Sequence, residues 1–253
     1  MRMLCSAARI SLHGSAALAV VIALGLPSLR ADRPHNFARW EKAIARFEQQ
    51  DLKSPPPRNA VLFVGSSSIV FWDLPKYFPG EKAINRGFGG SEIIDSVHFA
   101  PRIVLKYQPR LIVFYAGDND IAAGTTPEQV LADFKTFVTV VHKDLPRTRI
   151  LYLSIKLSPL RWSLADKMRR ANRLIEGYCK QEPLLTYLDV ASPLLDDKGK
   201  PQRRYFRRDG LHLSAQGYDV WTSLVRPYLK HADKASKQTS QGWSGVRQDN
   251  QAA

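Results

Sequence analysis

The strongest constraint on the fold is a series of five short, mostly apolar runs separated by segments with helical periodicity. The runs cover residues 61–64, 83–85, 111–115, 150–155 and 185–189. Runs of this length and composition predict strands that are buried on both faces. Strands that alternate with helices predict a parallel sheet with helices on both sides. The sequence therefore predicts an α/β fold, a three-layer α/β/α sandwich with a roughly five-stranded parallel sheet.

The segments between the runs carry helix signals. Apolar residues recur at spacings of three and four before the first run, which predicts an N-terminal helix at about 36–50. These residues are Phe37, Trp40, Ile44 and Phe47. Thr126 followed by Pro127 has the pattern of a helix cap and first helical position. A last helix is expected to begin near Ser214 and to reach Tyr228.

The two ends of the chain differ from its middle. Residues 1–31 contain early arginines and then an apolar run at 16–26, which is the pattern of a secretory signal and is short for a membrane span. We expect export to the periplasm or the medium with cleavage near Ala31, and an uncleaved N-terminal membrane anchor is the alternative. Residues 231–253 are polar and predict a disordered tail. Residues 33–230 are predicted to form one domain.

The composition narrows the classes of partner and cofactor. The net charge of +14 is compatible with nucleic acid, an anionic membrane or acidic polymers. No nucleic-acid motif is present, so we expect no nucleic acid partner, whereas association with an anionic membrane or cell envelope stays open. The densest basic group, at 203–208, either favours an anionic substrate or is a solvated loop. The cysteines Cys5 and Cys179 provide neither a disulfide framework nor a metal-ligand spacing.

Four polar clusters follow predicted strands or lie in a late loop, at 65–68, 87–91, 117–120 and 209–212. The carboxyl ends of parallel strands meet at one edge of the sheet, where α/β proteins bind ligands. A serine there can act as a nucleophile, although small polar residues after a strand also cap helices. A histidine three residues after an aspartate can act as a general base, although this spacing also occurs in loop hydrogen bonds. The order Ser, Gly, Asn, Asp–His is more specific than any one cluster.

With these clusters, residues 58–230 resemble the SGNH (GDSL-type) esterase and lipase superfamily, in the branch similar to platelet-activating-factor acetylhydrolase and lysophospholipase L1-like proteins. The resemblance implies the flavodoxin-like SGNH hydrolase fold. It implies that Ser67 is the nucleophile and that Asp209 and His212 complete a catalytic triad. Ser66 stands where the family usually has an aspartate. This departure weakens the first motif but removes no catalytic group.

The resemblance also implies an oxyanion hole. Its donors would be the backbone N–H groups of Ser67 and Gly90 and the side-chain amide of Asn119. Three aromatic residues, Trp72, Phe88 and Tyr115, are candidates to contact the substrate, although such residues belong to the core at least as often.

The function that the resemblance implies is a serine ester hydrolase of the carboxylesterase, lysophospholipase or acetylesterase kind. It would act on a small-molecule, lipid or carbohydrate ester through an acyl-enzyme, with no metal or organic cofactor. Two alternatives remain open from the sequence. One is an O-acyltransferase in which a sugar hydroxyl replaces water. The other is a non-catalytic surface-binding protein that keeps the fold.

Overall fold

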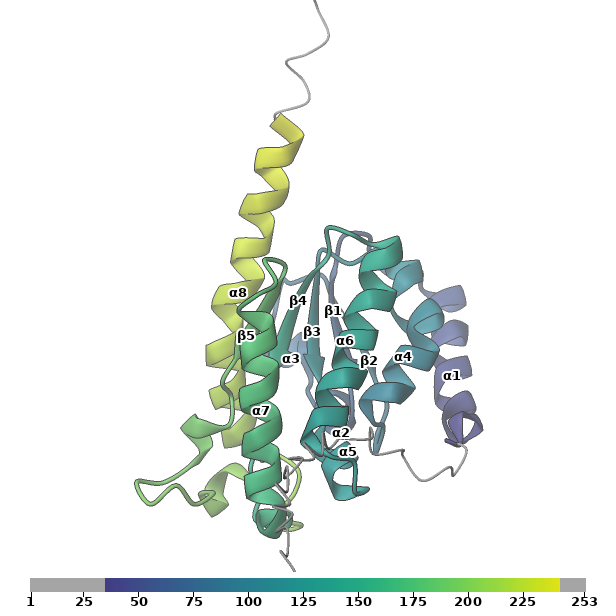
Figure 1. Cartoon of the computed structure of the whole chain (residues 1–253). Helices are drawn as coiled ribbons and strands as arrows, with labels where there is room; N and C mark the ends of the chain where they lie inside the picture. The colour runs from purple at the N-terminus through teal and green to yellow at the C-terminus, as the bar shows by residue number, and fades with distance from the viewer. Residues whose placement is uncertain (1–34, 242–253) are drawn as a thin grey trace, which may run out of the picture. The chain divides into compact units, whose positions relative to one another are not determined.

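Five parallel strands form one sheet in the order β2-β1-β3-β4-β5 in the computed structural model (Figure 1). Their bounds are Val61–Gly65 for β1, Ala83–Gly87 for β2, Leu111–Tyr115 for β3, Arg149–Leu153 for β4 and Leu185–Leu188 for β5. The predicted α/β fold with a five-stranded parallel sheet is confirmed. The first strand in sequence, β1, lies inside the sheet, with β2 on one side and β3, β4 and β5 on the other. The strand order therefore reverses between β1 and β3. Ligands of such sheets bind at the carboxyl ends of the strands beside this reversal.

The structure describes residues 35–241. The signal or anchor segment expected at residues 1–31 lies outside the described residues, as do residues 242–253 of the expected tail. Within the described part, no helix is both long enough and apolar enough to cross a membrane.

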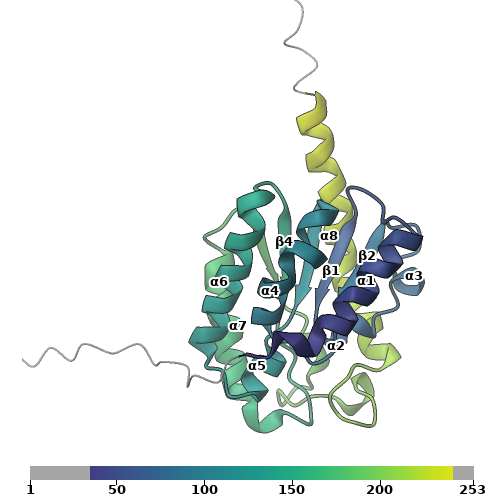
Figure 2. The same ribbon diagram turned by 90° about the vertical axis from the view of Figure 1, so that its right-hand side faces the viewer.

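Eight α-helices surround the sheet within the described residues. They are α1 Glu41–Lys53, α2 Ser67–Val70, α3 Leu74–Tyr77, α4 Ile93–Ile103, α5 Asp118–Ala122, α6 Pro127–Asp144, α7 Ala165–Cys179 and α8 Ala215–Gln241. Short 3-10 helices lie at η1 Phe37–Trp40, η2 Leu105–Tyr107, η3 Trp162–Leu164, η4 Ser192–Leu194 and η5 Arg203–Tyr205. Helices α1, α4, α6 and α7 lie on one side of the sheet, and α3 and α8 lie on the other (Figures 1 and 2). This arrangement is the predicted three-layer sandwich.

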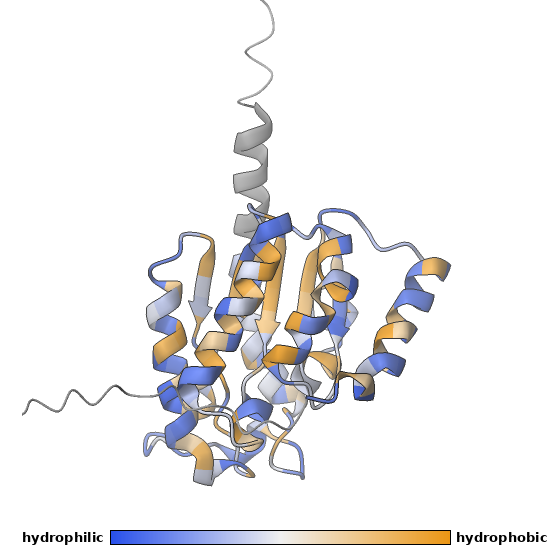
Figure 3. Ribbon diagram, turned by 45° about the vertical axis from the view of Figure 1, so that its right-hand side comes forward, coloured by the Kyte–Doolittle hydropathy of each residue, from blue (hydrophilic) through white to orange (hydrophobic). Residues whose placement is uncertain are grey.

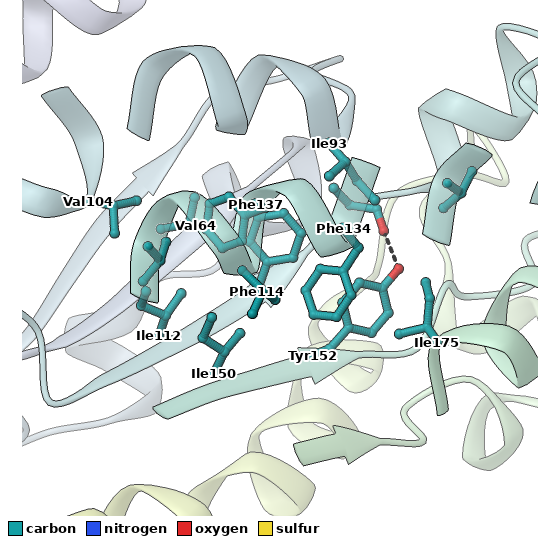
Figure 4. Close-up of a cluster of buried hydrophobic side chains, with 14 of the residues drawn as sticks. Val64, Ile93, Val104, Ile112, Phe114, Phe134, Phe137, Ile150, Tyr152 and Ile175 are labelled. Atoms are coloured by element: carbon teal, nitrogen blue, oxygen red, sulfur yellow. Dashed lines mark hydrogen bonds between the residues drawn. The ribbon is translucent and has the colours of Figure 1, made fainter. Parts of the chain in front are cut away.

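Two hydrophobic cores follow from the alternation of side chains along the strands. In β1, Leu62 and Val64 face the core beneath α4, α6 and α7, whereas Val61 and Phe63 face the core beneath α8. Figure 4 shows the first core, where the Tyr152 hydroxyl donates a hydrogen bond of 2.8 Å to the carbonyl of Ala116. The central strands form the apolar layer, and the helices are hydrophilic on their outer sides (Figure 3).

One local prediction differs from the structure. The sequence predicts a disordered tail from residue 231, but α8 continues as a helix to Gln241. The physical reason is that Ala, Lys and Gln in this segment are good helix formers, and extending an existing helix needs no new nucleus. The predicted strand at 111–115 ends at Tyr115 as expected, and residues from Asp118 form the short helix α5.

Candidate active site

The end of β1 is shaped by a close approach to β3. Gly65 has a φ of +138°, and a Cβ atom at this position would lie 1.8 Å from the carbonyl oxygen of Tyr115. Only glycine fits there. The next residue, Ser66, donates its backbone N–H to the same carbonyl at 3.1 Å. The chain therefore turns sharply after β1 and places Ser67 at the first position of α2.

The three adjacent serines differ in accessibility. Ser66 and Ser68 are fully buried, with 0% of their surface exposed, whereas Ser67 is partly exposed. The Oγ atom of Ser67 lies 3.0 Å from Nε2 of His212. Of the three hydroxyl groups, that of Ser67 is the one in contact with a potential general base.

His212 is held by a tight turn with Asp209. Its Nδ1 atom lies 2.7 Å from Oδ2 of Asp209. The other carboxylate oxygen accepts backbone N–H groups from Leu211 at 2.8 Å and from His212 at 3.0 Å. Because an ionised carboxylate only accepts hydrogen bonds, this contact places the proton on Nδ1. The free lone pair of Nε2 then faces the hydroxyl of Ser67.

The same contacts determine the charge of Asp209. Burial raises the pKa of the carboxyl, but hydrogen bonds from the His212 ring and from the backbone N–H groups of Leu211 and His212 outweigh it. The pKa of Asp209 is therefore held well below its usual range. Asp209 is negatively charged wherever the imidazole is neutral, and it can stabilise the charged imidazole.

The glycine loop after β2 lies against Ser67. A Cβ atom on Gly89 would lie 3.8 Å from the Cβ of Ser67. The next residue, Gly90, has a φ of +77°, and its backbone N–H makes no hydrogen bond within residues 35–241. The N–H of Ser67 is at the start of α2, where such groups have no intrahelical partner. Within the described part of the chain, two of the expected oxyanion donors are thus unpaired beside the serine.

The third expected donor, Asn119, lies in α5 and contacts the same loop. Its Nδ2 atom donates to the carbonyl of Ser91 at 2.9 Å, and its Oδ1 atom accepts from Nη2 of Arg161 at 2.8 Å. An arginine can only donate and a carbonyl can only accept, so the orientation of the amide is determined. One N–H of the amide nitrogen remains for a ligand.

A buried charged network supports this amide, and the sequence analysis missed it. Lys156 is 1% exposed, and its Nζ donates to Oδ2 of Asp118 at 2.8 Å and to the hydroxyl of Tyr115 at 2.9 Å. Nη1 of Arg161 lies 3.0 Å from the same Asp118 oxygen. Burial raises the pKa of Asp118, but the two cations outweigh it and the pKa is lowered overall. A lone lysine and a lone arginine after β4 carry no sequence signal that would identify them.

Asp120, the last residue of the third polar cluster, is fully buried. Its Oδ1 accepts the backbone N–H of Ile93 at 2.9 Å. Burial raises its pKa to about 8, and the negative charges of Glu92 and Asp118 add to this effect. Asp120 is therefore mostly neutral at pH 7 and ties the start of α4 to α5.

The three aromatic candidates for substrate contact belong to the core. Trp72, Phe88 and Tyr115 are 1%, 2% and 0% exposed. Trp72, for example, packs against Phe63 with ring centroids 5.4 Å apart. The expectation that these rings line the site is therefore corrected, because strand and helix packing buries them.

Other apolar side chains lie exposed beside the triad. Phe71 is 41% exposed, and its ring contacts the ring of His212 edge-on at 5.0 Å. The neighbouring Val70 is 41% exposed. Leu160 is 63% exposed, and its backbone N–H donates to the carbonyl of Gly210 at 2.9 Å. These residues give the site an apolar rim that periodicity does not reveal.

The described residues include no group of three or more His, Cys, Asp or Glu side chains arranged to hold a metal ion.

The fold and the site together define a class of protein. A parallel α/β sheet that brings a serine, a histidine and an aspartate into hydrogen-bond contact beside its topological switch point has the layout of a serine hydrolase. The model of the GDSL-like lipase/acylhydrolase family matches residues 70–220, and the chain belongs to this family. The match begins just after the α2 serines. No curated protein sequence matches the chain.

Solved structures of related folds agree with this assignment. A Streptococcus pneumonia protein, provisionally described as a platelet activating factor, has a TM-score of 0.68 and 21% identity, over 76% of this chain and 94% of that chain. A GDSL-like lipase from Bacteroides thetaiotaomicron has a TM-score of 0.63 and 20% identity, over 78% and 98%. An acetyl-xylooligosaccharide esterase from Geobacillus Stearmophilus has a TM-score of 0.55 and 13% identity, over 69% and 95%. These structures share the fold, and the family supports a hydrolase that acts on esters. Neither comparison favours acyl transfer or a non-catalytic role.

Proposed function

We propose that this protein hydrolyses carboxylic esters through a triad of Ser67, His212 and Asp209. The observation that carries the proposal is the continuous chain of contacts from Asp209 Oδ2 to His212 Nδ1 at 2.7 Å and from His212 Nε2 to Ser67 Oγ at 3.0 Å. These are the distances over which a general base can accept a proton from a nucleophile.

The reaction follows from the placement of these groups. Ser67 Oγ attacks the carbonyl carbon while its proton passes to Nε2 of His212. Collapse of the tetrahedral intermediate breaks the ester C–O bond, and His212 returns the proton to the departing alcohol. Water, activated by His212, then attacks the acyl-enzyme and releases the acid. Asp209 stabilises the imidazolium in both steps.

The negative oxygen of the tetrahedral intermediate needs donors that are already in place. The backbone N–H groups of Ser67 and Gly90 and the free N–H of the Asn119 amide supply them in this proposal. Arg161 acts as a positioning residue, because it holds the amide oxygen of Asn119 away from the oxyanion. Preorganised donors of this kind supply a large share of catalysis in acyl transfer.

The substrate proposed is a small-molecule, lipid or carbohydrate ester. The exposed side chains of Val70, Phe71 and Leu160 offer apolar surface to an acyl chain or an apolar leaving group. One structural neighbour is an acetyl-xylooligosaccharide esterase, so acetyl esters are also candidate substrates.

The test is covalent labelling followed by kinetics. Purified protein is treated with a fluorophosphonate and digested, and we expect the label on Ser67. A panel of para-nitrophenyl esters of graded acyl length, with and without EDTA, then gives kcat/KM for each chain length. Hydrolysis that is abolished by EDTA and restored by added zinc, or a protein that neither labels nor hydrolyses any ester, would overturn the proposal.

A further inference from the structure

Around the candidate triad, in the part of the chain that the structure describes, arginines without acidic partners outnumber the carboxylates. Three exposed arginines from two segments contact residues at or next to the site: Arg39 in η1, and Arg203 and Arg207 in and just after η5. None of the three forms an ion pair with an acidic side chain within residues 35–241. Other arginines at the surface, such as the half-buried Arg102 with Glu48 and the exposed Arg170 with Glu128, have acidic partners.

Arg39 lies beside the proposed oxyanion hole. Its Nη2 atom is 3.3 Å from the position of a Cβ atom on Gly90, whose backbone N–H is a proposed donor. The guanidinium stacks over the ring of Trp40, with Cζ 4.2 Å from the ring centroid. Trp40 is 9% exposed, so the ring is a rigid support. The stacking leaves the edge of the guanidinium, which carries its N–H donors, free for a ligand.

Arg203 and Arg207 lie near the two triad residues Asp209 and His212. Nη1 of Arg203 is 2.9 Å from the position of a Cβ atom on Gly210, the residue that follows Asp209. Cζ of Arg207 lies 4.5 Å from the ring centroid of Phe71, and that ring contacts His212. Both arginines are therefore held at the surface where a substrate reaches Ser67.

The ionised carboxylate of Asp209 offsets at most one of these three positive charges. Both of its oxygens are used, one by Nδ1 of His212 and the other by the backbone N–H groups of Leu211 and His212. The three arginines therefore direct an excess of positive charge toward a ligand, which raises the local concentration of anions and their rate of encounter. Guanidinium groups also bind carboxylates and phosphates in a fixed geometry.

We infer that the preferred substrate is an anionic ester, one that carries a carboxylate or phosphate group close to the scissile carbonyl. This inference rests on the proposed ester hydrolysis and names the substrate class of that site. It also chooses between the two interpretations of the basic group at 203–208, which were a group that favours an anionic substrate and a solvated loop. Arg203 and Arg207 are parts of the substrate surface in this proposal, and Arg39 reaches the same surface from a segment more than 150 residues away in the sequence.

The experiment compares esters that differ in charge and share one acyl group. The probes are para-acetoxybenzoate, para-acetoxyphenyl phosphate and the neutral para-acetoxybenzamide. Each kcat/KM is divided by the rate constant for cleavage of the same ester by a neutral nucleophile, imidazole, which corrects for intrinsic reactivity without adding a charge effect. We expect each anionic ester to exceed the neutral one by at least about 5-fold at low salt, since an exposed ion pair gives about 2- to 5-fold. Added KCl should reduce this ratio.

Variants locate the source of the preference. Arg39→Gln and the double variant Arg203→Gln/Arg207→Gln should each move the ratio of anionic to neutral kcat/KM toward one. Arg147→Gln is the matched control, because Arg147 is exposed and precedes β4 at the opposite edge of the sheet. Arg203 and Arg207 also donate to backbone carbonyls, so thermal midpoints are measured. Arg39 makes no such bond in the described residues and keeps the test informative if the double variant is unstable.

The outcomes separate the inference from the function on which it rests. If the neutral ester is hydrolysed with the same normalised kcat/KM as the anionic ones, or if Arg147→Gln lowers the ratio as much as the other variants do, the anionic preference is overturned and the hydrolase remains. If no ester is hydrolysed and Ser67 is not labelled by the fluorophosphonate, the proposed function fails and the inference fails with it.

Discussion

Nη2 of Arg161 lies 2.8 Å from Oδ1 of Asn119, and this contact orients the amide. The two residues are 42 positions apart in the chain, and Arg161 is in turn paired with the buried Asp118. The contact joins the loop after β4 to the helix after β3. The two residues would have different roles in catalysis. Asn119 would contact the reacting oxygen, whereas Arg161 would act only by orienting Asn119.

A double-mutant cycle tests these two roles. Asn119→Ala is expected to lower kcat by about 10²–10³ with little change in KM, because one oxyanion donor is lost. Arg161→Met removes the hydrogen bond that orients the amide, and we expect about a 10-fold loss of kcat. The double variant should be no worse than Asn119→Ala, because Arg161 has nothing left to position. Arg161→Lys should recover part of the loss. A raised KM with an unchanged kcat in Arg161→Met would show instead that Arg161 binds substrate directly.

The three serines should differ sharply in their effect on activity. Ser67→Ala is expected to reduce kcat by about 10⁴-fold or more, as other serine nucleophiles do. Ser66→Ala and Ser68→Ala are matched controls, since both hydroxyls are buried and have no hydrogen-bond partner in the described residues. They should retain much of the activity. Mass spectrometry of the fluorophosphonate adduct identifies the labelled residue, and label on Ser66 or Ser68 would show that the assignment is wrong.

Asp209 should matter for the tautomer of His212. In Asp209→Asn the amide oxygen is expected to keep the two backbone N–H groups, so the NH₂ faces Nδ1 and moves the imidazole proton to Nε2. That tautomer cannot accept the proton of Ser67, and kcat should fall by up to about 10⁴-fold at neutral pH. The lowered pKa of Asp209 also means that it stays ionised down to about pH 4, so its titration should not appear in the pH profile of kcat/KM. A wild-type kcat in Asp209→Asn would show that Asp209 has no part in the mechanism.

Asp120 should make stability depend on pH. Its pKa is raised to about 8 in the folded protein, against about 3.9 in an unfolded chain. Between these values the folded state holds a proton that the unfolded state has lost, so the free energy of unfolding falls as pH rises from about 4 to about 8. Asp120→Asn should remove this slope, which is at most about 1.4 kcal/mol per pH unit.

Denaturant unfolding at about pH 5 and about pH 8 measures the effect of Asp120→Asn. The gain in stability over the wild type should be larger at the higher pH. Asp166→Asn is the control, because the Asp166 side chain is 100% exposed. Parallel pH curves for the wild type and Asp120→Asn would contradict the assignment.

Much of the fold is determined by local sequence patterns. Strands β1, β3, β4 and β5 are mainly apolar runs, whereas β2 also contains Asn85 and Arg86. Helix α6 begins at the predicted cap, where Thr126 Oγ1 accepts the N–H of Gln129 at 3.2 Å. Such patterns indicate which face of a helix or strand is apolar, and they can be recognised from a few neighbouring residues in the sequence. They also place the four polar clusters in order, because the strand ends of a parallel sheet meet at one edge. The extension of α8 was missed because helix continuation needs no apolar face.

Only the tertiary structure decided which residues meet. Ser67 and His212 are 145 positions apart, and no local pattern encodes their 3.0 Å contact. Burial also depends on packing between layers, so the sequence could not show that Tyr115 belongs to the core and that Phe71 stays exposed beside His212. The pairing of Lys156 with Asp118 and the approach of Arg39 to Gly90 come from elements that fold back from distant parts of the chain. Side-chain type and spacing therefore specify the candidate chemistry, and the packing of the layers selects the residues that can perform it.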